Sequence, residues 1–126
     1  MSKDHGHVIW NELNSPDPEK AMAFYGPIMG WTFSPMPMAD GRPYWTISKD
    51  SAVVGGIFPL DPVEFAGVPP HWFTYFGVDD VDRRAAEAVA AGGTIVRPVF
   101  DVPCVGRIAV VQDAEGAYQA WMTPVG

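Results

Sequence analysis

Cysteine and basic residues are scarce in this sequence. Cys104 is the single cysteine, so no disulfide can form within the chain, and a reducing cytoplasm is the expected location. Eight Lys and Arg residues stand against fifteen Asp and Glu residues, which gives a formal net charge of −7, and only Arg83 and Arg84 are adjacent. Because nucleic-acid binding needs concentrated positive charge against phosphates, this composition argues against a nucleic-acid partner.

Long apolar runs are also missing. No run of about 18 apolar residues occurs, so the sequence predicts no membrane-spanning helix and no membrane partner. The first residues, MSKDHGHV, lack the apolar core of a signal peptide. What is present, 48% hydrophobic and 13% aromatic residues, is enough to build a packed interior, and we expect one compact domain over residues 1–126.

The stretch from residue 8 to residue 31 sets the plan for the chain. Residues 8–14 alternate with a period of two, which predicts a strand. Asp17 followed by Pro18 is typical of a helix start, and Gly30 is typical of a helix end. Further strands are expected at 31–36, 43–48 and 52–58.

The same plan returns about 63 residues later. A strand is expected at 72–78, a helix between Asp80 and Gly92-Gly93, and strands at 94–100, 106–112 and 117–123. A shift of 63 places Asp17 on Asp80 and Gly30 on Gly93, and a shift of 65 applies near the end. The sequence therefore predicts an α+β fold of two tandem βαβββ modules, 7–58 and 72–124, joined by a linker, 59–71. Each module would form a curved half-barrel sheet, and the two concave faces would enclose a cavity suited to a small molecule.

Five motifs stand out along the chain: WNELNSPDPEKAMAFY at 10–25, GW at 30–31, VDDVD at 78–82, GG at 92–93 and VQDAEG at 111–116. In this order, they resemble the vicinal oxygen chelate superfamily, also called the glyoxalase/bleomycin-resistance/dioxygenase fold. The pattern is especially similar to the branch typified by a mycobacterial 27–30 kDa antigen. The resemblance covers residues 7–124 and implies a homodimer, because family modules usually complete their sheets by pairing.

The resemblance also implies a metal held by four His or Glu ligands, from the first and last strands of each module. Those positions fall on Trp10, Phe73, Gly55 and Ala120 in this sequence. None of these side chains offers a lone pair that holds a divalent metal, so we expect no metal and no cofactor. Two aromatic and two tiny residues would form a slot for a flat apolar molecule, or would simply fill a closed core.

Glu12 and Tyr75 are the candidate catalytic residues. Glu12 lies two residues beyond Trp10 and shares its strand face, as Tyr75 does with Phe73. A carboxylate in an aromatic cavity is suited to act as a general base or to accept a ligand's N–H or O–H. The alternative is a structural glutamate bonded to the backbone or to a nearby arginine.

Three hypotheses follow. The preferred one is a metal-free protein that binds a small, partly apolar or aromatic molecule. The alternative is a lyase, isomerase or dioxygenase-like enzyme that uses Glu12, or a divalent metal bound by His5, His7 and His71. The third is an interaction module with a filled core. The residues expected to bind the ligand are Trp10, Glu12, Trp45, Gly55, Phe73, Tyr75, Tyr118 and Ala120.

Overall fold

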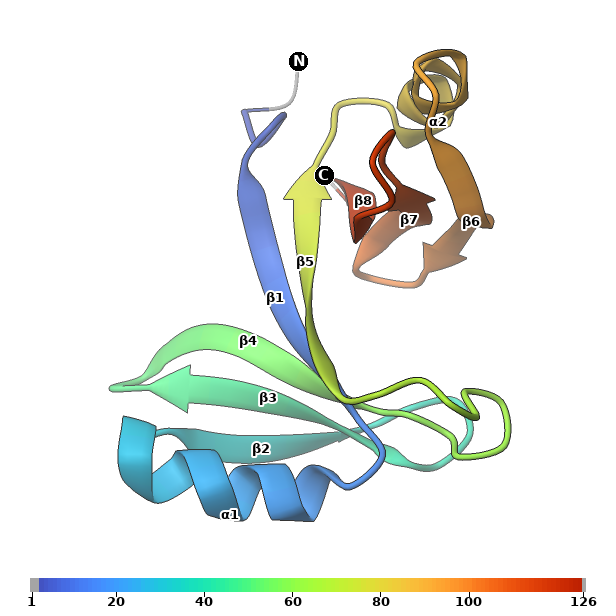
Figure 1. The fold of residues 1–126 in the computed structure, drawn as a ribbon. Coiled ribbons are helices and arrows are strands. Elements are labelled where there is room, and N and C mark those ends of the chain that lie inside the picture. The colour runs from blue at the N-terminus through green and yellow to red at the C-terminus, as the bar shows by residue number, and fades with distance from the viewer. Residues whose placement is uncertain (1–2, 126) are drawn as a thin grey trace. The chain divides into compact units, whose positions relative to one another are not determined.

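The computed structural model describes residues 3–125, and its elements follow the predicted βαβββ order twice (Figure 1). The chain divides into two compact units, which are described separately below. The first unit is residues 10–72, and the second is residues 3–9 together with residues 73–125. The fold class is α+β, as the sequence predicted.

The first unit is a four-stranded sheet with one helix. Its sheet order is β2-β3-β4-β1, with β1 parallel to β4 and the other pairs antiparallel. The elements are β1 (Val8–Ser15), α1 (Pro18–Met29), β2 (Thr32–Pro37), β3 (Pro43–Lys49) and β4 (Ala52–Pro59). Because the first strand pairs with the last one, side chains of β1 lie next to those of β4.

Helix α1 begins and ends where the sequence predicts. The Asp17 side chain accepts the backbone N–H of Lys20 at 3.2 Å, and Pro18 occupies the first turn. Gly30 closes the helix in the left-handed conformation, with φ of 69°. The helix covers one sheet face, where Leu13, Ile47 and Ile57 form a buried cluster.

The second unit repeats this arrangement. Its sheet order is β5-β8-β7-β6, with β5 parallel to β8. The elements are β5 (His71–Gly77), whose first two residues belong to the first unit, α2 (Val81–Ala90), β6 (Thr94–Val102), β7 (Gly106–Gln112) and β8 (Tyr118–Pro124). Asp80 caps α2 by accepting the backbone N–H of Arg83 at 3.2 Å, which matches Asp17 in the first unit.

The repeat is inexact at the end of α2. The sequence aligned Gly30 with Gly93, but the glycine with a positive φ after α2 is Gly92, at 96°. Gly93 instead donates its N–H to the Ala88 carbonyl and packs tightly against backbone. Within the described part of the chain, the longest helix has 12 residues, and none is long and apolar enough to cross a membrane.

Candidate ligand-binding site

Three side chains form a hydrogen-bonded chain on the first unit's sheet, on the face opposite α1. The Trp10 indole N–H donates to the Tyr44 hydroxyl oxygen at 2.9 Å. The Tyr44 O–H in turn donates to Oε2 of Glu12, also at 2.9 Å. Glu12 is only 7% exposed, while the two aromatic residues are half-buried. A buried carboxyl is therefore oriented by a hydrogen bond at the end of this chain.

Strand pairing explains how these residues meet. Alternation along β1 places Trp10 and Glu12 on one face. Glu12 lies opposite Gly56 of β4, and Gly56 lies opposite Thr46 of β3. A Cβ atom on Gly56 would overlap the Tyr44 hydroxyl. The missing side chain of Gly56 is therefore what allows Tyr44 to reach across β4 to Glu12.

The same face continues beyond Glu12 into polar and aromatic contacts. The Asn14 amide nitrogen lies 3.4 Å from Nε2 of His71, whose Nδ1 lies 2.8 Å from the Pro69 carbonyl oxygen. Phe58, paired with Asn14, meets the Phe65 ring edge-on at a centroid distance of 6.2 Å. The segment after β4 thus packs a ring against this face, and the face offers aromatic surface beside a carboxyl.

Two of the four residues predicted for this unit lie elsewhere. Trp45 pairs with Ile57 and packs into the cluster beneath α1, so it faces away from Glu12. Gly55 lies opposite Ile47 on that same helix side. The residue that matches Ala120 is Gly56, because Ala120 lies opposite Tyr75 as Gly56 lies opposite Glu12. The shift from Gly56 to Ala120 is 64 residues, rather than the 65 expected from the sequence.

The predicted residues of the second unit mostly pack together. The Phe73 and Tyr75 rings meet edge-on at 5.8 Å, and both contact a buried cluster that contains Ala120. Ala120 is fully buried, so the rings occupy the space that its small side chain leaves. Tyr118 is 60% exposed at the start of β8 and lies outside this cluster. Glu12 and Tyr75 belong to different units, and their joint action stays a prediction.

The residues present do not fit a divalent metal. With the corrected register, the four positions that the resemblance assigns to ligands hold indole, phenyl, hydrogen and methyl side chains. The alternative set of His5, His7 and His71 spans both units, with His71 in the first and the other two in the second, so joint metal binding by these residues stays a prediction. The positions that the resemblance assigns to ligands supply none of the donors that a metal needs.

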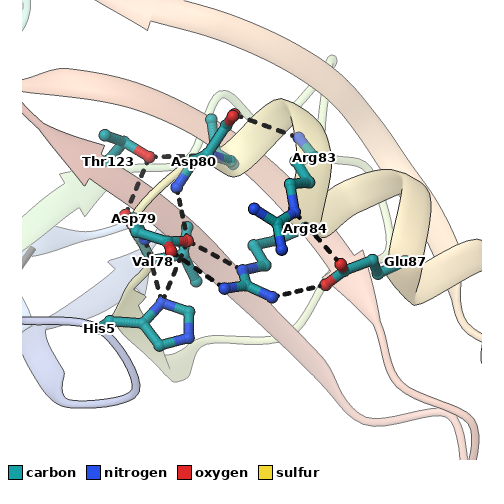
Figure 2. A network of polar contacts seen from close by, with 9 residues as sticks. His5, Val78, Asp79, Asp80, Arg83, Arg84, Glu87 and Thr123 are labelled. Carbon is teal, nitrogen blue, oxygen red and sulfur yellow. Dashed lines mark hydrogen bonds and ion pairs between the residues drawn. The ribbon is translucent and has the colours of Figure 1, made fainter. Parts of the chain in front are cut away.

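A separate polar network lies at the start of α2 (Figure 2). The Arg84 guanidinium donates to both oxygens of Asp79, at 2.9 and 3.0 Å, and to Glu87 at 2.8 Å. The bonds from Arg84 hold the pKa of the Asp79 carboxyl well below its usual range, and they raise the pKa of Arg84. Together with the Asp80 cap, this network fixes the start of α2.

Tyr44 and Gly56 belong to this candidate site but were not among the residues predicted for it. Tyr44 is one of several aromatic residues on central strands, and alternation alone does not tell which face each occupies. Gly55-Gly56 inside a strand is a recognisable signal of close approach by another group, and it could have pointed to this position.

Residues 6–118 match the model of the Glyoxalase/Bleomycin resistance protein/Dioxygenase superfamily. The chain is 44% identical over 124 residues to "Putative glyoxylase CFP32" of Mycobacterium tuberculosis, which covers 98% of this chain and 46% of that protein. It is 30% identical over 128 residues to the anthracycline biosynthesis protein DnrV of Streptomyces peucetius, covering 92% and 46%. The chain thus spans less than half the length of these curated relatives.

Solved structures of the same fold include methylmalonyl-CoA epimerases. That of Mycobacterium tuberculosis has a TM-score of 0.67 at 15% identity and covers 100% of this chain and 93% of that one. A variant of the Streptomyces coelicolor epimerase in complex with 2-nitronate-propionyl-CoA has a TM-score of 0.66 at 16% identity, covering 94% and 97%. At these identities the likeness shows the fold and leaves the activity open.

Proposed function

Because the chain belongs to the glyoxalase/bleomycin resistance protein/dioxygenase superfamily, we propose that it binds a small, partly aromatic or apolar molecule without a metal. The binding surface is the sheet face of the first unit that carries Trp10, Tyr44 and Glu12. The observation that carries the proposal is the pair of 2.9 Å hydrogen bonds that ends on the buried Glu12 carboxyl.

The chemistry of this face specifies the ligand class. Oε2 of Glu12 accepts the Tyr44 O–H, and the proposal is that the same carboxyl accepts an N–H or O–H of a ligand, as carboxylates commonly accept more than one hydrogen bond. The neighbouring rings favour flat apolar groups through stacking and edge-on contacts. A ligand with a flat ring and one hydrogen-bond donor matches both features.

The Streptomyces relative gives limited support for this class. Its name refers to anthracycline biosynthesis, and anthracyclines are flat polycyclic aromatic compounds that carry hydroxyl groups. A role in sequestering or carrying such a molecule fits a sheet face that carries a carboxyl beside aromatic side chains. The homodimer implied by the resemblance stays part of the proposal, and sedimentation of the purified chain tests it.

The test uses two probes that differ in their hydrogen-bond donor. 2-Naphthol carries a donor, and 2-methoxynaphthalene has the same rings without one. We expect 2-naphthol to shift the Trp10 indole N–H signal in nitrogen-15 spectra and to bind more tightly than the ether. Glu12→Gln should weaken 2-naphthol binding by about tenfold or more, since a bond to a charged acceptor is lost.

Glu19→Gln is the matched control, because it makes the same charge change at an exposed position on α1 of the same unit. It should leave both affinities unchanged. Equal affinity for the two probes, or an unchanged affinity of Glu12→Gln for 2-naphthol, would rule out the Glu12 carboxylate as the hydrogen-bond acceptor for the ligand.

An isomerase or lyase that uses Glu12 as base is the second candidate. The observation that favours it is the orientation of the carboxyl by Tyr44, which is what a general base requires. In such a step, the substrate C–H bond next to a carbonyl breaks, its proton passes to the Glu12 carboxylate, and the electron pair forms an enolate.

Deuterium exchange distinguishes this candidate from simple binding. Acetophenone, a flat aromatic ketone with acidic methyl C–H bonds, is incubated with the protein in heavy water. The enzyme hypothesis is supported if the protein exchanges the methyl protons faster than buffer alone does, if Glu12→Gln loses this acceleration, and if Glu19→Gln retains it. Exchange no faster than buffer rejects the base role toward this class of ketone and leaves the binding proposal intact.

A further inference from the structure

The opposite face of the first unit's sheet carries a hollow of about 360 Å³ under α1. From its lining we infer a second binding site, for a neutral, planar aromatic molecule that carries a hydrogen-bond acceptor. The site is separate from the Glu12 face: Asn11, which lines the hollow, alternates along β1 with Trp10 and Glu12.

Three aromatic rings form two walls of the hollow. Tyr25 and Trp31 are stacked, with centroids 5.4 Å apart and planes 28° from parallel. Trp72 stands edge-on to both, at 5.6 Å and 77° from Tyr25 and at 6.0 Å and 75° from Trp31. A flat ring placed in this corner can stack on one wall and meet the other edge-on, which are the two preferred aromatic geometries.

Large apolar side chains at the rim are left open to solvent. Met29, Val54 and Trp72 are 46%, 46% and 42% exposed. Val54 points here because of a bulge: Ile47 pairs with Gly55 and Ser48 with Val53, which leaves Val54 without a place in the ladder. Bulges commonly redirect a side chain in this way. A ligand would cover surface that the described residues leave in water.

The Tyr25 hydroxyl and the lack of charged side chains define the rest of the ligand. None of its lining residues, all within 10–72, is charged, so a charged ligand would find no partner there. The Trp72 indole N–H donates to the Tyr25 hydroxyl oxygen at 3.2 Å. Tyr25 therefore accepts this bond and keeps its own proton to donate, which favours a ligand with a carbonyl or another acceptor.

The probe for this site is 2-acetylnaphthalene, compared with 2-ethylnaphthalene, which has a similar shape and no acceptor. We expect the ketone to shift the indole N–H signals of Trp31 and Trp72 and to leave that of Trp10 unchanged. It should bind about three- to tenfold more tightly than the hydrocarbon, and Tyr25→Phe should abolish this preference. Signals are assigned with Trp31→Phe and Trp72→Phe.

Met29 and Ile28, two adjacent apolar residues on α1, provide a matched pair of variants. Met29→Ala, which removes part of the hollow's rim, should weaken the ketone several-fold. Ile28→Ala removes a side chain that is 65% exposed and does not line the hollow, and should have no effect. Equal losses in both variants would contradict the assignment of the ligand to this hollow.

Other outcomes also overturn the inference. Tighter binding of tetramethylammonium than of the ketone would make the rings a cation site. If the Trp31 and Trp72 signals move with protein concentration alone, and sedimentation shows association, a second copy covers this face. Shifts confined to Trp10 would place the ketone on the Glu12 face, which would leave the proposed function standing and remove this site.

Discussion

The Tyr44 hydroxyl reaches the Glu12 carboxyl across an entire strand. Tyr44 lies on β3 and Glu12 on β1, and β4 runs between them. The bond is 2.9 Å long because Gly56, the residue of β4 between them, has no side chain to block it. The proposed ligand face therefore depends on a glycine as much as on its polar residues.

Gly56→Ala should displace Tyr44 from Glu12. The new Cβ would overlap the hydroxyl, so the ring must move, and overpacking of this kind typically costs about 1–3 kcal/mol of stability. We expect lower stability in urea unfolding, a shifted Trp10 indole signal and weaker 2-naphthol binding. Gly26→Ala makes the same chemical change in α1, where the nearest atom would be 3.4 Å away, and should retain binding.

Tyr44→Phe removes both hydrogen bonds while keeping the ring. The Trp10 N–H loses its acceptor and Oε2 of Glu12 loses a donor, which should reduce the free energy of unfolding by about 1–3 kcal/mol. Equilibrium urea unfolding measures this loss. Tyr118→Phe, at a position 60% exposed, should change stability by less than about 0.5 kcal/mol. Equal effects of the two variants would mean that the Tyr44 bonds add nothing to stability.

The ion pair of Asp79 and Arg84 should make stability depend on pH at the acid end (Figure 2). The pKa of Asp79 is lowered in the folded state, chiefly by the Arg84 hydrogen bonds, from an ordinary value of 3.8. Its stabilising contribution is therefore fully present above the unfolded-state pKa and is lost progressively as the pH falls below about 4. Wild type should exceed Asp79→Asn in stability by a constant amount above about pH 5.

That difference should shrink below about pH 4, as measured by urea midpoints. Both proteins are compared in a His5→Ala background, because the His5 ring also contacts Asp79, at 3.4 Å. Glu115→Gln, an exposed carboxylate of the same unit, provides a control whose difference from wild type stays small. A difference that grows on acidification would contradict the linkage.

The helix caps and the order of elements were predictable because they depend on neighbours in sequence. Asp17 and Asp80 each accept an N–H three residues onward, and Asp113 accepts the N–H groups of Glu115, Gly116 and Ala117 at 2.9 Å. Such contacts are determined by a few adjacent residues, and the sequence pattern displays them directly.

The faces of the central strands were not predictable in the same way. The bulge at Val54 shifts the register by one, so counting from the repeat selected Gly55 where the structure has Gly56. A one-residue slip moves a side chain to the other face of a sheet, and the pairing that causes it lies on β3. Trp45, predicted for the ligand face, packs beneath α1 for a different reason: alternation along a strand does not tell which of the two faces a given side chain occupies.

His71 and His5 should carry their protons on opposite ring nitrogens when neutral. Nδ1 of His71 lies 2.8 Å from the Pro69 carbonyl oxygen, which only accepts, so that nitrogen must donate, and Nε2 then accepts from Asn14. Nδ1 of His5 instead accepts the backbone N–H of Asp79 at 3.1 Å, so the proton of His5 lies on Nε2. Long-range proton–nitrogen spectra recorded at alkaline pH distinguish the two tautomers. The same tautomer at both residues would show that at least one of these contacts is absent in solution, and Asn14→Ala should weaken the Nδ1–H preference of His71 alone.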